Sequence, residues 1–405
     1  MTNIISSSLL GNYVVNCRYQ HFYFMSNILT RGVETILPSK EALLERLDQG
    51  KIKLYLGIDA TGPTLHLGHL VSLLKLRDFQ QAGHEVVVLW GDFTSRIGDP
   101  TDKLAARQIL TPDEVENNLK DYRRQVLLIL DEDKTTFRRN SEWFDRMSAQ
   151  DLLTLATEFT DKDLTDRDMF VERKKQGKPV YANELFYPLL QGYDSVALGV
   201  DLEVGGNDQL FNMLSGRDLL AKRGKEKFVL ANKLLTDPTG KKMGKTEGNM
   251  AKLTDSANDI FGKIMSWPDT LTPLGLEILT RLPKGECEEL LAGHPKAAKL
   301  ALAQAVVSLI YGPAAAGEAK DQFEATFSSG EATIEPVVII AAAGAKLADV
   351  LVVEGLVKSK SEFRRLVEQN GVEIEGEKLS DPDYEILSEV SGRLGAHRFI
   401  KIKLL

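Results

Sequence analysis

Two histidines beside a glycine are the first side chains in this sequence that could act on a phosphate. They are His66 and His69, in a stretch that reads Asp-Ala-Thr-Gly-Pro-Thr-Leu-His-Leu-Gly-His over residues 59–69. The intervening Gly68 lets a ligand approach the backbone closely. A helix that begins here would also offer free N–H groups and a positive dipole end to an anion. Histidines in this place could equally cap the helix or pack against it.

A second reactive stretch lies far along the chain, at residues 241–249, and reads Lys-Lys-Met-Gly-Lys-Thr-Glu-Gly-Asn. Lys242 and Lys245 flank its Met-Gly pair, and the preceding residues 235–240 are rich in turn formers. Lysines on a mobile loop suit a site that closes over a polyphosphate and neutralises charge as it develops. Taken alone, the stretch could also be a solvated surface loop.

The residues around the histidine stretch predict a strand, a loop, a helix and a second strand. Residues 53–58 and 85–90 are apolar runs of the length of a buried strand. Between them, residues 68–81 keep apolar positions at helical spacing, and Gly83 offers a stop. In open α/β sheets, loops at the carboxyl ends of parallel strands bind ligands. We therefore expect the histidine loop at such an edge.

A stripe of polar side chains marks a further predicted helix. Tyr187, Gln191 and Asp194 fall at positions i, i+4 and i+7, so that all three project from one helix face. The neighbouring residues are mostly apolar, and polar atoms in such surroundings need hydrogen-bond partners. A small polar ligand would supply them. A helix edge exposed to water is the alternative.

The histidine and lysine stretches together resemble the two signatures of class I aminoacyl-tRNA synthetases. The stripe of residues 187–194 resembles the tyrosine-binding helix of tyrosyl-tRNA synthetases, and the related tryptophanyl enzymes lack it. The resemblance extends over residues 26–405. It implies an α/β fold with a Rossmann-like parallel-sheet catalytic domain, followed by an α-helical domain and a small α+β RNA-binding domain.

The resemblance implies a tyrosine–tRNA ligase. The tyrosine carboxylate would attack the α-phosphate of ATP, pyrophosphate would leave, and the 3′ end of tRNA(Tyr) would then take the tyrosyl group. Catalysis would be positioning plus electrostatics, without a protein nucleophile. The catalytic residues would be His66 and His69 at the phosphates and Lys242 and Lys245 at the leaving pyrophosphate. Mg²⁺ would be carried with ATP, and no tightly bound protein metal is expected.

The same resemblance assigns the binding residues by position. Asp99, in a Gly-Asp-Pro turn, would face the amino group of tyrosine; Asp194 would meet the phenol, which Tyr55 could reach from the other side. The residues expected at tyrosine are Tyr55, Asp99, Tyr187, Gln191, Asp194 and Gln209. The residues expected at ATP are Asp59, Thr61, Gly68, Lys103, Gly206, Asp208, Lys242 and Lys245.

Composition limits the other possibilities. The chain has 405 residues, 43% hydrophobic and 27% charged, with a net charge of −8. These values are ordinary for a globular protein of two or three domains and argue against a generally basic surface. Two cysteines do not make a disulfide framework, and no apolar run approaches the roughly 20 residues that span a membrane. We expect a cytoplasmic enzyme with no membrane contact.

The expected domain organisation follows composition and the resemblance. Residues 1–35 would be an N-terminal extension or arm, of which 1–24 are either disordered or the result of a wrong start site. A targeting segment is less expected, because a basic start and apolar core are missing. The further ranges are 36–250 for the catalytic domain with an inserted helical segment at about 112–180, 251–328 for the helical tRNA-binding domain, 329–345 for a linker and 346–405 for the RNA-binding domain. In the resembled family the insertion builds the interface of a homodimer.

The C-terminal domain carries a local basic patch although the domain as a whole is not basic. A predicted helix at residues 361–367 places charges near its start, and it resembles a small RNA-binding domain shared with a ribosomal protein of the small subunit. The residues expected to contact RNA phosphates are Lys358, Lys360, Arg364 and Arg365. An ordinary amphipathic helix is the alternative.

Two rival functions share part of the pattern. A nucleotidylyltransferase that makes a small adenylated metabolite would use the histidine loop, but it would not need the lysine loop or the two C-terminal domains. A non-enzymatic RNA-binding regulator would use the last domain, but it would have no need for the ATP loops. Pyrophosphate exchange into ATP, measured one amino acid at a time, separates the three.

Overall fold

The structure is a computed structural model of the chain, and its residues group into two compact units, Met1–Lys320 and Asp321–Leu405. It describes residues 25–100, 110–165, 168–236, 250–328, 337–357, 359–368, 371–395 and 398–404. Within these ranges no helix is both long and apolar enough to cross a membrane.

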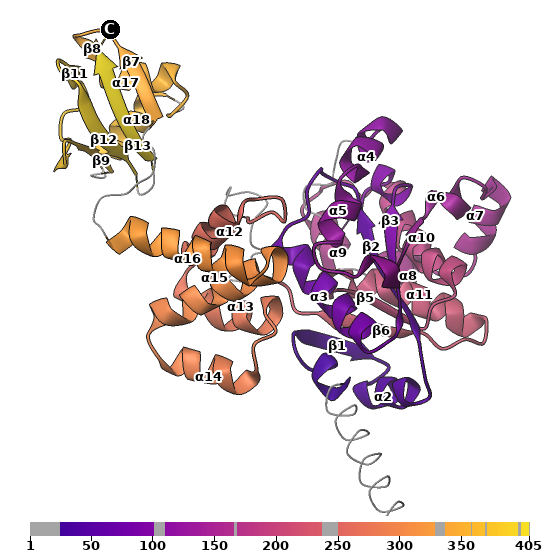
Figure 1. Cartoon of the computed structure of the whole chain (residues 1–405). Coiled ribbons are helices and arrows are strands. Elements are labelled where there is room, and N and C mark those ends of the chain that lie inside the picture. The colour runs from indigo at the N-terminus through magenta and orange to yellow at the C-terminus, as the bar shows by residue number, and fades with distance from the viewer. Residues whose placement is uncertain are drawn as a thin grey trace, which may run out of the picture. The chain divides into compact units, whose positions relative to one another are not determined.

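The first unit is built on a six-stranded sheet (Figure 1). Its strands are β1 (Val33–Leu37), β2 (Lys53–Asp59), β3 (Glu85–Gly91), β4 (Thr135–Arg139), β5 (Leu202–Gly206) and β6 (Phe228–Asn232). They run in the order β1-β6-β5-β2-β3-β4, and every neighbouring pair is parallel except β1 with β6. The predicted α/β fold with a parallel sheet is confirmed.

The strand order places a reversal of direction at the centre of the sheet. From β2 the chain moves to β3 on one side, and from β5 it moves to β6 on the other side. Because parallel crossovers are right-handed, the helices of these two connections, α3 (Leu67–Gln81) and α11 (Leu210–Lys222), lie on opposite faces (Figure 1). The carboxyl ends of β2 and β5 therefore border the crevice in which open α/β sheets bind ligands.

The local sequence explains why these elements form. The inner strands are near-continuous apolar runs, since helices cover both faces; Val86, Val87 and Val88 of β3 are fully buried. Helix α2 (Lys40–Asp48) begins after Ser39, whose hydroxyl accepts a hydrogen bond from the Ala42 N–H at 3.1 Å. The strands and the helix predicted around the histidine loop are confirmed to within one residue.

Many of the remaining elements of the catalytic part are short. They are η1 (Thr94–Arg96), α4 (Pro112–Leu119), α5 (Tyr122–Val126), η2 (Glu132–Lys134), α6 (Ser141–Phe144), α7 (Ala149–Ala156), α8 (Asp161–Thr165), α9 (Asp168–Lys175), α10 (Ala182–Leu198) and η3 (Asn207–Gln209). The long helix α10, which carries the polar stripe, packs against α11.

Two predicted boundaries of this part are wrong. The insertion expected at 112–180 contains β4, which pairs with β3 as an edge strand of the main sheet. Its sequence, Thr-Thr-Phe-Arg-Arg, is too charged to resemble a buried strand, but Phe137 stacks on Trp90 with ring centroids 5.6 Å apart. The expected arm of residues 1–35 also ends too late, because β1 begins at Val33.

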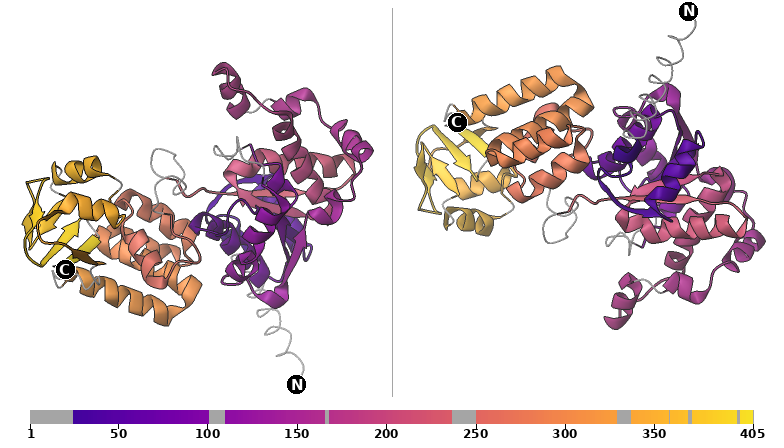
Figure 2. Two further views of the ribbon diagram at one scale, coloured as in Figure 1. Left: turned by 90° about the horizontal axis from the view of Figure 1, so that it is seen from above. Right: turned by 90° about the horizontal axis from the view of Figure 1, so that it is seen from below.

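A helical module follows the sheet in the first unit (Figure 2). Its elements are α12 (Ala257–Met265), η4 (Asp269–Leu271), α13 (Thr272–Leu279), α14 (Lys284–Ala292), α15 (Pro295–Tyr311) and α16 (Pro313–Ser328), the last of which crosses the boundary between the units. Phe261, Leu302 and Val306 form part of its buried interior. Arg281 holds both carboxylate oxygens of Asp78 on α3, the closest at 2.7 Å, and so fastens this module to the helix of the histidine loop.

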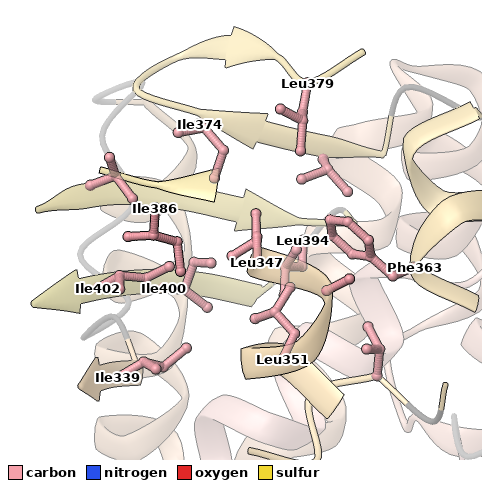
Figure 3. Packing of buried hydrophobic residues seen from close by; sticks show 14 of the residues in the cluster. Ile339, Leu347, Leu351, Phe363, Ile374, Leu379, Ile386, Leu394, Ile400 and Ile402 are labelled. Atoms are coloured by element: carbon pink, nitrogen blue, oxygen red, sulfur yellow. The ribbon is translucent and has the colours of Figure 1, made fainter. Parts of the chain in front are cut away.

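The second unit has its own sheet and core. Its elements are β7 (Val337–Ala341), β8 (Ala345–Lys346), α17 (Leu347–Val353), α18 (Lys360–Glu368), β9 (Val372–Ile374), β10 (Glu377–Lys378), β11 (Glu385–Ile386), β12 (Val390–Leu394) and β13 (Arg398–Leu404). Five strands run in the order β10-β9-β12-β13-β7, and β8 pairs with β11. Phe363 of α18 packs with Leu351, Ile400 and Ile402 in the interior (Figure 3).

The linker expected at residues 329–345 is partly wrong. Residues 337–341 are β7, which pairs in parallel with β13 along its whole length. The run Val-Val-Ile-Ile-Ala is β-branched and suits a strand better than a linker. The separate unit at the C-terminus therefore includes residues before the predicted start at 346.

Candidate active site

The two histidines lie together at the start of α3. His66 is the N-cap residue: its Nδ1 accepts from the Gly68 N–H at 3.1 Å, and the Nδ1 of His69 accepts from the His66 N–H at 3.2 Å. The ring centroids are 4.0 Å apart. Because each Nδ1 acts as an acceptor, each neutral ring carries its proton on Nε2. Both rings therefore offer an N–H donor of the kind a phosphate oxygen needs.

The glycine between the histidines has a packing role. A Cβ at Gly68 would lie 2.9 Å from Cε1 and 3.0 Å from Nδ1 of His66. A side chain here would push the His66 ring off the helix start. The sequence predicts that Gly68 lets a ligand approach the backbone. In the structure, the space that a Cβ at Gly68 would need lies against the His66 ring.

The residues that follow the lysine stretch pair with the histidine loop. Lys242 and Lys245 fall outside the described residues, as does Lys103. The backbone just after the loop pairs with the histidine stretch: the Leu67 N–H donates to the Ala251 carbonyl at 3.0 Å, and the Leu253 N–H donates to the Leu65 carbonyl at 2.9 Å. Residues 251–253, which follow the lysine stretch in sequence, therefore lie against the histidine stretch through backbone hydrogen bonds.

Asp59 is the last residue of β2, and its carboxylate is largely buried. It accepts hydrogen bonds from the Thr94 hydroxyl at 2.7 Å and from the Tyr187 hydroxyl at 2.9 Å. Burial raises the pKa of Asp59 to about 7, although the two hydroxyls act in the opposite direction. The contact joins the histidine strand to the polar stripe of α10.

Asp194, the second member of this group, is 4% exposed. Its carboxylate accepts from the Trp143 indole N–H at 2.9 Å and more weakly from the Asn140 amide at 3.5 Å. Burial raises the pKa of Asp194 well above its ordinary value, and the two donors lower it in part. A further hydrogen-bond donor would stabilise the charged form of a carboxylate in this setting.

The sequence did not identify Asn140 and Trp143 as site residues. They follow β4, inside the segment interpreted as an insertion, and Asp92 holds them in place by accepting from the N–H and hydroxyl of Ser141 at 2.9 and 2.7 Å. Asn140 is fully buried and also donates to Thr94 at 3.0 Å. An asparagine that directly follows a strand would have been the available signal.

Three polar residues of α10 share one face, as predicted, and each has a partner. Tyr187 donates to Asp59 at 2.9 Å, Gln191 donates to Glu203 at 2.9 Å, and Asp194 accepts from Trp143. The alternative of a water-exposed edge fails for Tyr187 and Asp194, which are buried.

The Gly-Gly turn after β5 brings the other polar candidates together. Gln209 donates its amide to Asp99 at 2.7 Å. Asp208 folds back over Gly206, where an added Cβ would lie 2.5 Å from its carboxylate oxygen. The turn thus connects Asp99, after β3, with the end of β5.

Tyr55 and Thr61 occupy contrasting positions. Tyr55 is fully buried on β2, and its hydroxyl lies 3.0 Å from the Ser195 hydroxyl. Burial, followed by the charges of Glu203 and Asp194, raises the pKa of Tyr55 well above its ordinary value. Thr61 is exposed in the histidine loop. The roles expected for both at the ligands remain predictions.

The described part of the site is rich in carboxylates. The charges of Asp59, Asp99 and Asp194 all act on the Tyr187 hydroxyl, whose pKa burial raises well above its ordinary value. Carboxylates around a common space can bind an ammonium group and a hydroxyl donor. Among the described residues, no group of three or more His, Cys, Asp or Glu is gathered for a metal ion.

The basic patch of the second unit lies on α18. Arg364 and Arg365 are exposed there, while Phe363 and Val367 on the opposite face are buried. Lys360 is exposed and forms an ion pair with Asp349 of α17. Lys358 lies outside the described residues. The helix is amphipathic, and its basic face is accessible.

Comparison with known proteins agrees with these features. Residues 47–328 match the family described as tRNA synthetases class I (W and Y), and residues 328–395 match the tyrosine–tRNA ligase SYY-like C-terminal domain. The tyrosine–tRNA ligase of Thermotoga maritima is 39% identical over 93% of this chain and 96% of that protein. The one of Geobacter metallireducens is 41% identical over 93% of this chain and 97% of that protein.

Solved structures support the fold. The C-terminally truncated mitochondrial tyrosyl-tRNA synthetase of Coccidioides posadasii superposes with a TM-score of 0.62 at 22% identity, over 78% of this chain and 99% of that one. The Archaeoglobus fulgidus enzyme complexed with L-tyrosine gives 0.57 at 23% identity, over 74% and 99%. The chain belongs to the class I tRNA synthetases of the tryptophan and tyrosine type, and within that class to the bacterial tyrosine–tRNA ligase family.

Replacing Asp59 with Asn should change how stability depends on pH. With a folded pKa near 7 and an unfolded value near 3.8, the folded wild-type protein retains a proton that the unfolded chain loses. Its stability therefore falls as pH rises from about 4 to about 7. The Asn variant lacks this loss of stability. Its free energy of unfolding should exceed that of the wild type by about 1 to 3 kcal/mol at pH 8 and should differ little from it at pH 4.

Thermal unfolding at pH 4.5, 6, 7 and 8 measures this difference. Asp145→Asn makes the same chemical change at an exposed position and should show no such trend. An Asp59→Asn advantage that was equal at every pH would contradict the burial-driven shift.

Proposed function

We propose that this chain joins tyrosine to tRNA(Tyr) in two steps and uses ATP to activate the amino acid. The observation that carries the choice of tyrosine is the stripe of Tyr187, Gln191 and Asp194 on α10, which contacts Asp59 at the end of β2, Glu203 of β5 and Trp143 after β4. An ammonium and a phenol are the two donors that such a set of acceptors binds best. The family membership supports the same substrates.

In the first step the tyrosine carboxylate oxygen forms a bond to the α-phosphorus of ATP. The bond from that phosphorus to the bridging oxygen breaks, and the electron pair leaves with pyrophosphate. The chain supplies no nucleophile; it aligns the reactants and stabilises the transition state. Magnesium would come with ATP and would offset part of the charge of the phosphates. In the second step a hydroxyl at the 3′ end of tRNA attacks the activated carbonyl, and AMP leaves.

Tyrosine is held at its two ends. Asp194 accepts a hydrogen bond from the phenol hydroxyl, and Tyr55 lies on the other side of that hydroxyl. Tyr187, Gln191 and Asp99 bind the ammonium group, and Gln209 fixes Asp99 by its 2.7 Å hydrogen bond. The raised pKa of Asp194 supports this role, because a buried carboxylate favours a ligand that brings a donor.

ATP lies along the start of α3. The Nε2–H groups of His66 and His69 donate to its phosphates, and Lys242 and Lys245 stabilise the pyrophosphate as charge develops on it. The remaining residues proposed at ATP are Asp59, Thr61, Gly68, Lys103, Gly206 and Asp208. The backbone contacts of Leu65 and Leu67 with Ala251 and Leu253 support the approach of the lysine loop to the phosphates.

The other domains serve the tRNA. The helical module of residues 251–328 approaches it, and the second unit binds it through Lys358, Lys360, Arg364 and Arg365. The exposure of Lys360, Arg364 and Arg365 supports phosphate contact. We place the enzyme in the cytoplasm, where tRNA is charged.

We further propose a homodimer that forms through the face of α6, α7 and α10. An apolar recess of about 270 Å³ lies there, lined by residues that include Phe93, Phe144, Leu152 and Leu190. Leu153 on α7 is 60% exposed beside it. Apolar surface of this kind favours burial against a second copy.

Asp194→Ala should cripple tyrosine activation and narrow the preference over phenylalanine. In the variant the phenol of tyrosine loses its charge-assisted hydrogen bond to Asp194. Bound phenylalanine, in turn, no longer leaves a buried carboxylate without a donor. We expect kcat/KM for tyrosine to fall by roughly 100-fold or more, equal to about 3 kcal/mol.

The measurement is pyrophosphate exchange with each amino acid. Asp78→Ala removes another buried aspartate, 8% exposed on α3, and should leave the preference unchanged. An Asp194→Ala enzyme that rejected phenylalanine as strongly as the wild type would refute the assignment. A wild type that exchanged pyrophosphate with no amino acid would refute the function itself.

Lys245→Ala should slow adenylate formation by orders of magnitude with little change in tyrosine binding. The Lys245 charge stabilises the pyrophosphate mainly while it leaves. The loss of this charge therefore raises the free energy of the transition state more than that of the bound reactants. Single-turnover kinetics and equilibrium tyrosine binding separate the two effects. A defect confined to tyrosine affinity would argue against this role.

Removal of residues 329–405 should leave tyrosine activation within about twofold of the wild type and impair tRNA charging by tenfold or more. A cut after Ser328 removes all of the second sheet, so β7 is not left exposed.

In the full chain, Arg364→Ala/Arg365→Ala should weaken tRNA binding. It should also make the slope of log binding constant against log salt concentration shallower, by the amount expected for the loss of about two phosphate contacts. Equal loss of activation and charging on truncation would mean that the second unit supports the catalytic fold instead.

A further inference from the structure

The loop that leads into the two histidines has little backbone structure of its own. Residues 60–65, which join β2 to α3, form neither helix nor strand. Their buried peptide groups must therefore find hydrogen-bond partners on other elements. Helices α4 and α5 supply several of these partners, although the mechanism above gives neither helix a role. Both helices lie in the segment that the sequence predicts to be an insertion.

Gln125 of α5 holds the end of this loop at two points. Its side chain is fully buried. Its Oε1 accepts from the Leu65 N–H at 2.7 Å, and its Nε2 donates to the Pro63 carbonyl at 3.2 Å and to the Asp121 carboxylate at 3.3 Å. One amide thus pairs with both an N–H and a carbonyl of the backbone directly before His66.

The earlier part of the loop is held from the same two helices. The Asn118 amide donates to the Ala60 carbonyl at 2.8 Å, and the Tyr122 hydroxyl donates to the Gly62 carbonyl. The Tyr122 ring packs edge-on against Trp90 of β3, with ring centroids 5.8 Å apart. The donor of Tyr122 is therefore fixed with respect to the central sheet.

The other side of the loop end is also paired. The Leu65 carbonyl accepts from the Leu253 N–H at 2.9 Å, so both backbone polar groups of Leu65 have a partner, one on α5 and one in residues 251–253. A shift of Leu65 would lengthen or break these bonds and would carry His66 with it. The direction of the His66 ring therefore depends on Gln125.

We propose that three residues, Asn118, Tyr122 and Gln125, are positioning residues of the histidine loop. They hold the loop so that the Nε2–H groups of His66 and His69 are aimed at the ATP phosphates. The inference rests on the proposed function and deepens it. Donors that are already in place stabilise a transition state without being reordered during the reaction. A displacement of about 1 Å can cost roughly 100-fold in rate.

The direct test is Gln125→Leu, which removes both contacts with the loop and leaves an apolar side chain of similar size in the buried space. Gln80→Leu is the matched control. Gln80 of α3 is 4% exposed, and its amide likewise pairs with one backbone segment, accepting from the Asp131 N–H at 2.9 Å and donating to the Asp131 carbonyl at 3.1 Å. That segment contains none of the residues proposed at tyrosine or ATP.

The measurements are single-turnover adenylate formation at saturating tyrosine and ATP, and equilibrium binding of tyrosine. We expect Gln125→Leu to lower the single-turnover rate constant by roughly 10-fold to 100-fold. Tyrosine affinity should stay within about twofold of the wild type, because the residues proposed at tyrosine keep their contacts. Gln80→Leu should change neither quantity by more than about twofold.

A purely structural role would lower the amplitude of the turnover, which reports the fraction of active enzyme, and would leave the rate constant unchanged. That result would overturn the proposal. An equal fall of the rate constant in Gln80→Leu would also overturn it.

Tyr122→Phe and Asn118→Ala test the same contacts if Gln125→Leu does not fold. Tyr122→Phe removes only the hydroxyl and keeps the ring on Trp90. Each variant should lower the rate constant at least about threefold, whereas Asn117→Ala, at the exposed neighbouring position of α4, should not.

Unchanged rate constants in both variants would overturn the proposal. A wild type that formed no adenylate with tyrosine would contradict the proposed function. Normal wild-type turnover with unaltered variants would contradict the positioning residues alone.

Discussion

Buried carboxylates are the constraint on which the catalytic site depends. Asp59 lies at the end of β2, Asp194 on α10 and Glu203 within β5, and each would be costly to bury without hydrogen-bond donors. The chain supplies hydroxyls, an indole, amides and one ammonium from elements distant in sequence. The positions of α10, β4 and β6 relative to β2 follow from the need to bring these donors together.

The reversal of strand order at β2 and β5 makes that assembly possible. Loops that leave the two strands diverge, which opens a crevice at their carboxyl ends. Helix α3 starts at His66 and His69 on one side of this crevice, and α10 carries Tyr187 and Asp194. In the function proposed above, the groups at the nucleotide phosphates and those at the tyrosine side chain therefore come from different helices.

Much of this was accessible from the sequence where a residue pattern is local. The apolar runs of β2 and β3, the spacing of α3 and the stripe of Tyr187, Gln191 and Asp194 all depend on near neighbours. The missed features arise from tertiary contacts. The edge strands β4 and β7 are short, and Asn140 and Trp143 become site residues only through Asp194, which is distant in sequence. No periodicity marks such residues.

The pairing of β7 with β13 has a consequence for synthesis of the protein. It joins the first strand of the second unit to β13, and Ile339 of β7 is buried in the same core as Ile400 and Ile402 of β13. The second unit cannot complete its core until β13 has left the exit tunnel, whereas all strands of the first sheet have been made by residue 232. The nascent chain can therefore complete the sheet of the first unit before the core of the second unit.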